Sequence, residues 1–293
     1  MGTIEKIFTA LGTVNHICVP FDGGDREPIR QALASAEKYI TNMDDRLSVF
    51  KPESEISQIN AHAGIRDTLV GRDTFDLLEL CVRCGELTGG AFDVTTKPLT
   101  DAAFTGAAVN YRDILLDRRK LSVRLRLRGQ GIHLGGIAKG YAVDRTAELL
   151  ERRGVKNAVI NLGGTVRNIG SRRRVGIRNP FAPAQTLLSF DSAGEAVATS
   201  GLYERGHHIF DPRSCQPADS DLLSVTAVGA DGATADAAAT ACMVVGFRQG
   251  VELLRQLNLE GIFILKDGGV FATEAIQSRI IGKSTGTINE KGA

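Results

Sequence analysis

The sequence predicts an α+β fold: a single compact domain over residues 1–293, with mixed, largely antiparallel sheets and flanking helices. Strand-like segments are found over residues 6–21 and again over 114–134. Several other segments carry apolar residues at steps of three and four, which is typical of helices. No linker or internal repeat divides the chain.

Composition and charge exclude some classes of function. Of the 293 residues, 43% are hydrophobic, so the chain can bury a substantial core. The 35 basic and 34 acidic residues leave a formal charge of +1, which argues against a surface for nucleic acid or for an anionic membrane. Two arginine clusters, at residues 124–128 and 172–174, have no aromatic residues among them, so we interpret them as solvated surface.

The cysteines and the lengths of the apolar segments indicate the cellular compartment of the protein. Five cysteines, an odd number, predict free thiols in a reducing environment. No segment has the features of a signal peptide, and none approaches the roughly 20 apolar residues that span a bilayer. We therefore expect a soluble, cytoplasmic protein. Cys81-x-x-Cys84 could be half a zinc site or a redox pair, but its helical pattern favours two packing residues.

The N-terminal part predicts two strands over residues 6–21, separated at Gly12, and then a helix over residues 29–47. Pro28 suits the first turn of that helix, where a missing N–H has no effect. Ser54 is a candidate cap for a short helix that would turn Ile56 and Ile59 inward.

The middle of the chain predicts a helix over residues 73–87, followed by an extended segment over 91–99 that carries Asp93 among apolar residues. After a loop over residues 101–110, short strands are expected over residues 114–134. There, apolar and polar residues alternate strictly, which predicts one solvated face; the apolar positions are Leu121, Val123, Leu125 and Leu127.

A glycine-rich junction at residues 135–140 opens the next predicted helix, which runs to Gly154. Such a junction brings backbone N–H groups close to phosphates at a helix N-terminus, and Lys139 adds a positive charge. The glycine spacing matches neither a Walker motif nor a dinucleotide fingerprint. A tight crossing of the helix over a sheet is an equally good explanation of these glycines.

The C-terminal half predicts a buried strand over residues 159–162, further short strands up to about residue 197, a strand over 223–228, a helix over 247–257 and a last hairpin over 261–275. Between residues 199 and 212 a hydroxyl pair, an imidazole and a carboxylate lie close in sequence. A hydrolase triad is one interpretation, although no Gly-x-Ser-x-Gly motif is present.

Asp236 and Thr240 lie in an alanine-rich predicted helix. Their spacing of four residues stacks the two side chains on one face, and the alanines leave room beside them. Two hard oxygens in open space suit a Mg²⁺ ion that keeps positions for phosphate oxygens and water. The alternative is a solvated Asp and a Thr that bonds back to its own helix.

Taken together, the motifs resemble the ApbE family of FAD:protein FMN transferases over residues 12–271. The resemblance rests on seven blocks in the same order: Ser54-Glu55-Ile56-Ser57-x-Ile59-Asn60, Gly89-Gly90-Ala91-Phe92-Asp93-x-Thr95, Leu134-Gly135-Gly136-Ile137-Ala138-Lys139-Gly140-Tyr141, Asn161-Leu162-Gly163-Gly164, Thr199-Ser200-Gly201, His208-Ile209-Phe210-Asp211-Pro212 and Ala235-Asp236-x-x-x-Thr240.

The resemblance implies a Mg²⁺-dependent enzyme that moves FMN from FAD onto a Thr or Ser hydroxyl of a target protein and releases AMP. By position, Asp236, Thr240 and the carbonyl of Ala138 match the family's magnesium ligands, and His208 matches the proposed base, so that His208 and Asp236 are the expected catalytic residues. The expected flavin-nucleotide residues are Glu55, Asn60, Phe92, Asp93, Lys139, Gly163, Gly164, Thr199 and Ser200.

The chain also departs from the family pattern. His133, Thr165 and Leu202 stand where the family usually has Asp, and Cys215 stands in place of a Gly. These changes keep two alternatives open: a Mg²⁺-dependent FAD pyrophosphatase that forms FMN and AMP, and a flavin-binding protein without catalysis. Family acceptors carry an Asp shortly before Ser/Thr-Gly-Ala-Thr. This chain has no such stretch, so the expected acceptor is another protein.

Overall fold

An eight-stranded sheet forms the centre of the computed structural model, which describes residues 2–100, 109–202 and 208–283. Every neighbouring pair in this sheet is antiparallel, which confirms the predicted fold class. In spatial order the strands are β1 (Gly2–Ala10), β2 (Thr13–Phe21), β6 (Ala158–Leu162), β7 (Thr165–Ile169), β10 (Ala196–Gly201), β13 (Leu222–Gly229), β14 (Glu260–Leu265) and β15 (Val270–Ala272).

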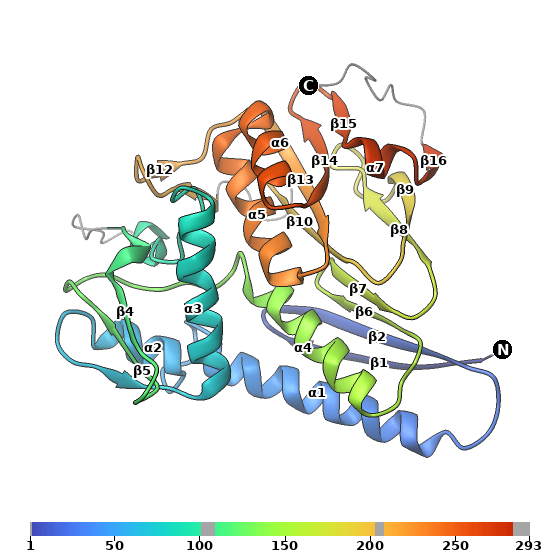
Figure 1. Cartoon of the computed structure of the whole chain (residues 1–293), viewed down its shortest axis with the longest axis horizontal. Coiled ribbons are helices and arrows are strands. Elements are labelled where there is room, and N and C mark those ends of the chain that lie inside the picture. Colours follow the sequence, from blue (N-terminus) through green and yellow to red (C-terminus); the bar gives the residue numbers. More distant parts are fainter. Residues whose placement is uncertain (1, 101–108, 203–207, 284–293) are drawn as a thin grey trace.

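Four helices pack on one face of this sheet (Figure 1). They are α1 (Glu27–Leu47), α4 (Ala138–Arg152), α5 (Gly232–Val245) and α6 (Phe247–Gln256). Helix α5 contacts β10 and β13 as well as α4 and α6, so it is surrounded by protein. Its alanines are buried on all sides, which is the expected pattern for a helix inside the core.

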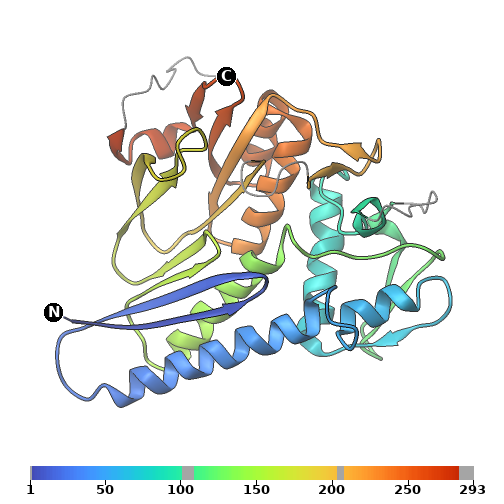
Figure 2. The ribbon, with the colours of Figure 1, turned by 180° about the vertical axis from the view of Figure 1, so that it is seen from behind.

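A second, three-stranded sheet covers part of the opposite face (Figure 2). It consists of β8 (Arg173–Arg178), β9 (Thr186–Ser192) and β16 (Ile280–Lys283), and the short helix α7 (Glu274–Gln277) lies before β16. The alternation along β14 shows the two faces: Ile262 and Ile264 pack with Phe190 of the small sheet, while Phe263 belongs to the core under the helices.

A smaller group of elements lies beside the helical face (Figure 1). It contains α2 (Glu55–Ala61), α3 (Arg72–Leu87) and the sheet β3 (Thr68–Leu69), β5 (Ser122–Leu125), β4 (Ile114–Asp117), with 3-10 turns at Lys97–Thr100 and Tyr111–Asp113. The predicted cap is confirmed, because Ser54 Oγ accepts the Ser57 N–H at 2.9 Å.

The predicted alternation over residues 121–127 is partly wrong. Strand β5 covers only Ser122–Leu125, so Val123 and Leu125 face inward as expected. Leu121 has a φ of +50° and belongs to the turn before the strand, and Leu127 is 42% exposed. The strand ends early because the chain turns toward Gln130, whose side-chain oxygen accepts the Leu127 N–H.

Cys81 and Cys84 both lie in the core on α3 and form no disulfide, which supports their interpretation as packing residues. Burial raises the pKa of the Cys84 thiol to about 12. Among the described residues, no helix combines the length and the apolar character that crossing a membrane requires.

Candidate functional site

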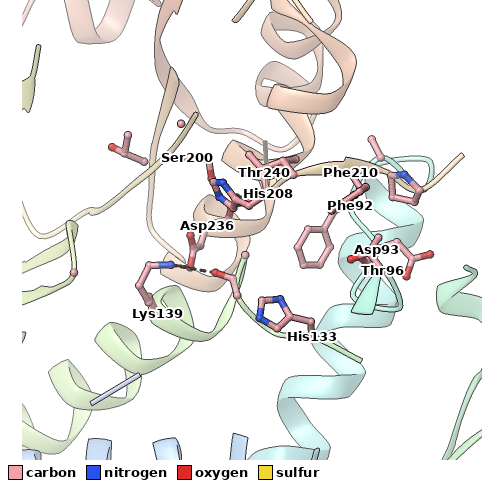
Figure 3. Close-up of a pocket in the computed structure, with 18 of the residues that line it drawn as sticks. Phe92, Asp93, Thr96, His133, Lys139, Ser200, His208, Phe210, Asp236 and Thr240 are labelled. Atoms are coloured by element: carbon pink, nitrogen blue, oxygen red, sulfur yellow. Dashed lines mark hydrogen bonds and ion pairs between the residues drawn. The ribbon is translucent and has the colours of Figure 1, made fainter. Parts of the chain in front are cut away.

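A cleft lies between the helical face of the large sheet and the smaller group around α3 (Figure 3). It encloses about 1050 Å³ of space, a volume that includes solvent at its open mouth. The start of α4, the middle of α5, the end of β10 and the loop after α3 all contribute. Its lining residues are Thr13, Ala91, Phe92, Asp93, Thr96, His133, Gly135, Gly136, Lys139, Gly163, Thr199, Ser200, Gly201, His208, Ile209, Phe210, Pro212, Asp236 and Thr240.

Asp236 is the most deeply placed charge of the cleft, at 1% exposure. Its Oδ2 accepts the Gly140 N–H at 3.0 Å and lies 3.8 Å from Lys139 Nζ. Lys139 Nζ also donates to the Gly135 carbonyl at 3.1 Å, which anchors the ammonium beside the carboxylate. Within the described residues, Asp236 Oδ1 accepts no hydrogen bond, so this oxygen remains available to a ligand.

Thr240 lies one turn further along α5, as the spacing predicts. Its Oγ1 contacts Ser200 Oγ at 3.0 Å and donates to the Asp236 carbonyl at 3.2 Å. Gly136 approaches it closely, since a Cβ at Gly136 would lie 2.8 Å from Thr240 Oγ1. The glycine thus keeps the space beside this hydroxyl open. The Thr240 hydroxyl therefore bonds back to its own helix, and Thr240 also lines the cleft.

The donor set is compatible with Mg²⁺. A carboxylate oxygen without a hydrogen bond and a hydroxyl oxygen one turn away are hard ligands, and Mg²⁺ commonly takes one or two protein ligands plus phosphate oxygens and water. No group of three His, Cys, Asp or Glu side chains with metal-site geometry occurs in the described part of the chain. Ala138 is the first residue of α4, directly before Lys139.

His208 lines the same cleft as Ser200 and Thr240, and its side chain is exposed (Figure 3). Asp211 is engaged in the adjacent hairpin, β11 (Phe210–Asp211) with β12 (Gln216–Pro217), where Arg213 donates to both of its carboxylate oxygens at 2.9 Å. Burial alone would raise the pKa of Asp211, but the hydrogen bonds from Arg213 outweigh it and hold that pKa below its usual value. These contacts favour a structural role for Asp211 over a part in a hydrolase triad.

Phe92 and Asp93 come from the loop that follows α3. Asp93 is buried, and its carboxylate accepts hydrogen bonds from the Thr95 N–H, the Thr95 hydroxyl and the Tyr111 N–H at 2.7–2.8 Å. Burial raises its pKa, although these hydrogen bonds act in the opposite direction. Asp93 therefore organises the loop that presents the Phe92 ring to the cleft.

Four residues of the predicted site do not line this cleft. Glu55 Oε1 accepts the Gly71 N–H at 3.0 Å, which joins α2 to the start of α3. The Asn60 side chain bonds both the N–H and the carbonyl of Ile132, at 2.7 and 3.0 Å, and so fixes the segment before His133. Ala138 is the first residue of α4 and is not among the lining residues, although Lys139 next to it is. Gly164 lines a neighbouring cavity, which shares Gly163, Thr199 and Gly201 with the cleft.

The four departures from the family pattern fall in different environments. His133 lines the cleft, with its ring against Gly135. Thr165 is buried, and its hydroxyl has no hydrogen-bond partner among the described residues. Leu202 is half-buried against the main core. Cys215 adopts a φ of +57° in the hairpin turn, a conformation that suits glycine.

Sequence reasoning missed several residues of the site. Thr13 and Thr96 line the cleft although neither belongs to a recognisable motif. Asp144, one turn after Gly140 on α4, reaches the first residues of α5. The pattern of an acid on the buried face of a helix, close to a glycine, was a signal that could have identified it.

Solved structures with this fold include an ApbE protein from Thermotoga maritima MSB8, with a TM-score of 0.84 and 27% identity, covering 95% of this chain and 99% of that chain. The structure called flavin transferase ApbE from Vibrio cholerae has a TM-score of 0.81 at 21% identity, covering 95% and 99%. The fold and the cleft therefore place the chain in a class: α+β proteins with the architecture of the solved ApbE proteins.

The sequence comparisons identify the family. The ApbE family pattern matches residues 11–263. A protein of Klebsiella pneumoniae (strain 342), named FAD:protein FMN transferase, is 34% identical over 264 residues, covering 81% of this chain and 83% of its own length. A Treponema pallidum (strain Nichols) protein of the same name is 30% identical over 302 residues, covering 87% and 83%. The chain belongs to the ApbE family.

Proposed function

We propose that this protein transfers FMN from FAD to a Thr or Ser hydroxyl of another protein, with Mg²⁺, and releases AMP. The observation that carries the proposal is the arrangement around Asp236: a buried carboxylate with one oxygen available, a hydroxyl one turn away at Thr240, and a lysine ammonium 3.8 Å from its other oxygen. A pyrophosphate bound with a metal ion needs this combination of hard oxygens and positive charge.

The cleft also suits the rest of FAD. The start of α4 brings the positive end of the helix dipole and the Lys139 ammonium to the cleft, and both favour phosphate oxygens. Phe92 and Phe210 offer apolar surface for a ring system at one side (Figure 3). The adjoining cavity beyond Gly163 and Thr199 adds length, as a dinucleotide requires. Glu55, Asn60 and Gly164 would then act from behind the lining.

The proposed reaction is one phosphoryl displacement. The acceptor hydroxyl oxygen attacks the FMN-side phosphorus, a new P–O bond forms, and the bond to the AMP oxygen breaks with its electron pair leaving on AMP. His208 takes the hydroxyl proton, as an imidazole can near neutral pH. Asp236, Thr240 and the Ala138 carbonyl would hold Mg²⁺, which neutralises charge on the pyrophosphate oxygens. Lys139 would bind a phosphate oxygen.

The test incubates the protein with FAD, Mg²⁺ and a substrate protein that carries an Asp shortly before Ser/Thr-Gly-Ala-Thr. AMP is quantified by chromatography, and the mass of the acceptor by mass spectrometry. We expect AMP together with covalent FMN on the acceptor, no product from Asp236→Ala, and slow transfer with retained FAD binding from His208→Ala. Asp113→Asn, at a buried acid in the 3-10 turn before β4, is the matched control and should stay active.

Two other results of this test would each identify one of the alternative functions. AMP formed equally without acceptor, and no labelled acceptor, would indicate the FAD pyrophosphatase. FAD binding without AMP under any condition would indicate the flavin-binding protein. The proposed partners are FAD and the acceptor, with no nucleic acid or membrane, and the free cysteines support a reducing, cytoplasmic location.

A further inference from the structure

We infer that Asp144 is a positioning residue for Asp236, because it fixes helix α5, which carries the carboxylate of the cleft, against helix α4. This inference deepens the proposed function and rests on it for the metal-binding measurement below. Asp144 lies outside the cleft lining, so it acts through the helices and not through a ligand.

The two helices exchange carboxylate contacts at their first turns. Asp144 Oδ2, on α4, accepts the N–H groups of Gly232 and Ala233 at 2.8 and 3.2 Å, at the start of α5. In return, Asp236 Oδ2, on α5, accepts the Gly140 N–H at 3.0 Å, in the first turn of α4. Each acid satisfies an N–H that its partner helix cannot pair internally.

The backbones at this crossing leave almost no room for displacement. A Cβ at Gly140 would lie 2.1 Å from the Gly232 carbonyl oxygen, and a Cβ at Gly232 would lie 2.8 Å from the Gly140 carbonyl oxygen. The glycines therefore serve a crossing of two helices, where the sequence suggested a helix over a sheet. Because the helix starts touch directly, a shift of α5 moves Asp236 relative to α4.

Asp144 is also tied to the large sheet. The Arg167 guanidinium on β7 pairs with Asp144 Oδ1, and the same Nη1 donates to the Ala230 carbonyl at 3.0 Å. Burial raises the pKa of Asp144 to about 6, with Arg167 acting to lower it, so the group is ionised in an assay at pH 7.5–8. An ionised carboxylate at a helix N-terminus is further stabilised by the helix dipole.

The contact between α4 and α5 sets the distance between the two sides of the cleft that these helices carry. Asp236 and Thr240 lie on one helix, so their mutual spacing is fixed by α5 itself. Lys139 and Gly136 belong to α4 and its entry segment, and their distances to Asp236 depend on how α4 and α5 meet. Asp144 is the side chain that connects these two helix starts from the α4 side.

The experiment compares Asp144→Ala and Asp144→Asn with wild type, with Asp113→Asn as the matched control. Asp113 is another buried acid, in the 3-10 turn before β4, bonded to Gln130 and paired with Arg126. Two quantities are measured at pH 7.5–8: Mn²⁺ affinity of the nucleotide-free protein by electron paramagnetic resonance, and hydrogen exchange of the Gly140 amide in ¹⁵N-glycine-labelled protein. Asp236→Ala calibrates the loss of metal binding.

We expect Asp144→Ala to weaken Mn²⁺ binding about 10- to 100-fold, as loss of outer contacts to metal ligands does. Exchange of the Gly140 amide should accelerate, although the substitution removes only side-chain contacts to α5 and to Arg167 of β7 and none to the Gly140 amide itself. Asp144→Asn keeps an oxygen acceptor and should give a smaller change of both. Asp113→Asn should lower the melting temperature without changing either quantity.

Wild-type values of both quantities in a folded Asp144→Asn or Asp144→Ala protein would overturn the inference, leaving Asp144 as a cap of α5 only. If wild type itself bound no Mn²⁺, the metal part of the proposed function would fail. The Gly140 amide would then still decide whether Asp144 positions Asp236: unchanged exchange would refute the coupling, and faster exchange would support it.

Discussion

Asp236 is a buried carboxylate whose two oxygens have different surroundings. Oδ2 is engaged with Gly140 and lies near Lys139, whereas Oδ1 accepts no hydrogen bond in the described part of the chain. A buried charge needs compensation, and Lys139 supplies part of it. The same ammonium is placed to meet a phosphate oxygen once a nucleotide enters the cleft.

Substitution of Lys139 tests this placement. Lys139→Met keeps the length of the side chain but removes the charge, and a hydrogen bond to a charged group contributes about 1.5–3 kcal/mol. We expect FAD affinity, measured by flavin fluorescence, to fall about tenfold or more. Lys139→Arg keeps the charge and should retain most of the affinity. Equal affinities for wild type and Lys139→Met would contradict a contact between Lys139 and the phosphates.

Cys215 is a non-glycine residue with a φ of +57°, in the left-handed region that favours glycine. The left-handed conformation costs an L-residue roughly 1–2 kcal/mol, while glycine loses about 0.5–1 kcal/mol in chain entropy on folding. Cys215→Gly should therefore raise the free energy of unfolding by up to about 1 kcal/mol in urea denaturation. Cys215→Ala keeps the strained φ and serves as control; a Gly variant no more stable than the Ala variant would refute the explanation.

At the scale of elements, the crossing of α4 and α5 decides where the cleft residues stand. A Cβ at Gly140 would lie 2.1 Å from backbone of α5, a contact that no rotamer change relieves. Gly140→Ala must separate the helices, and we expect a loss of about 1–3 kcal/mol in the free energy of unfolding, as for overpacked cores. FAD turnover should fall with it, because Lys139 and Asp236 move apart.

Gly282→Ala is the control for that substitution. Gly282 lies in β16, and a Cβ there would meet nothing within 4 Å. The free energy of unfolding of both variants is measured by urea denaturation. That of Gly282→Ala should stay within about 0.5 kcal/mol of wild type. A Gly140→Ala protein as stable and as active as Gly282→Ala would show that α4 and α5 tolerate displacement.

At the scale of the whole molecule, buried thiols make stability depend on alkaline pH. Burial raises the pKa of Cys242 from 9.0 to about 12, so the folded protein holds this proton after the unfolded chain has released it. The contribution to stability is complete below pH 9 and is lost as the pH rises toward 12. Cys242→Ala should reduce this decline by about 1.4 kcal/mol per pH unit in denaturation curves.

Val244→Ala is the matched control, because it removes a buried apolar side chain from the same helix without an ionisable group. It should lower stability at all pH values and leave the slope between pH 9 and 12 unchanged. Equal slopes for wild type and Cys242→Ala would mean that Cys242 does not hold its proton in the folded state.

Much of the fold could be predicted because local patterns carry it. The period of apolar residues places α1 within two residues and α3 within one residue of the observed bounds, and the Ser54 cap follows from a local hydrogen bond. The strand over residues 121–127 was predicted too long, since Leu121 lies in a turn that only the pairing of β4 with β5 defines. Strand β16 and its pairing with β9 had no sequence signal.

The sequence by itself determined the long helices α1 and α3, the family resemblance and the helical spacing of Asp236 and Thr240, because these depend on residues close in the chain or on motifs that persist in order. Only the tertiary structure decided that Glu55 and Asn60 lie outside the cleft lining and that Lys139 lies beside Asp236. The tertiary structure also decided that Asp144 of α4 bonds to the start of α5 and that Asp236 of α5 bonds to the start of α4. These contacts join segments that lie far apart in the chain, 96 residues in the case of Gly140 and Asp236, and their geometry depends on how packed helices meet, which local sequence patterns do not encode.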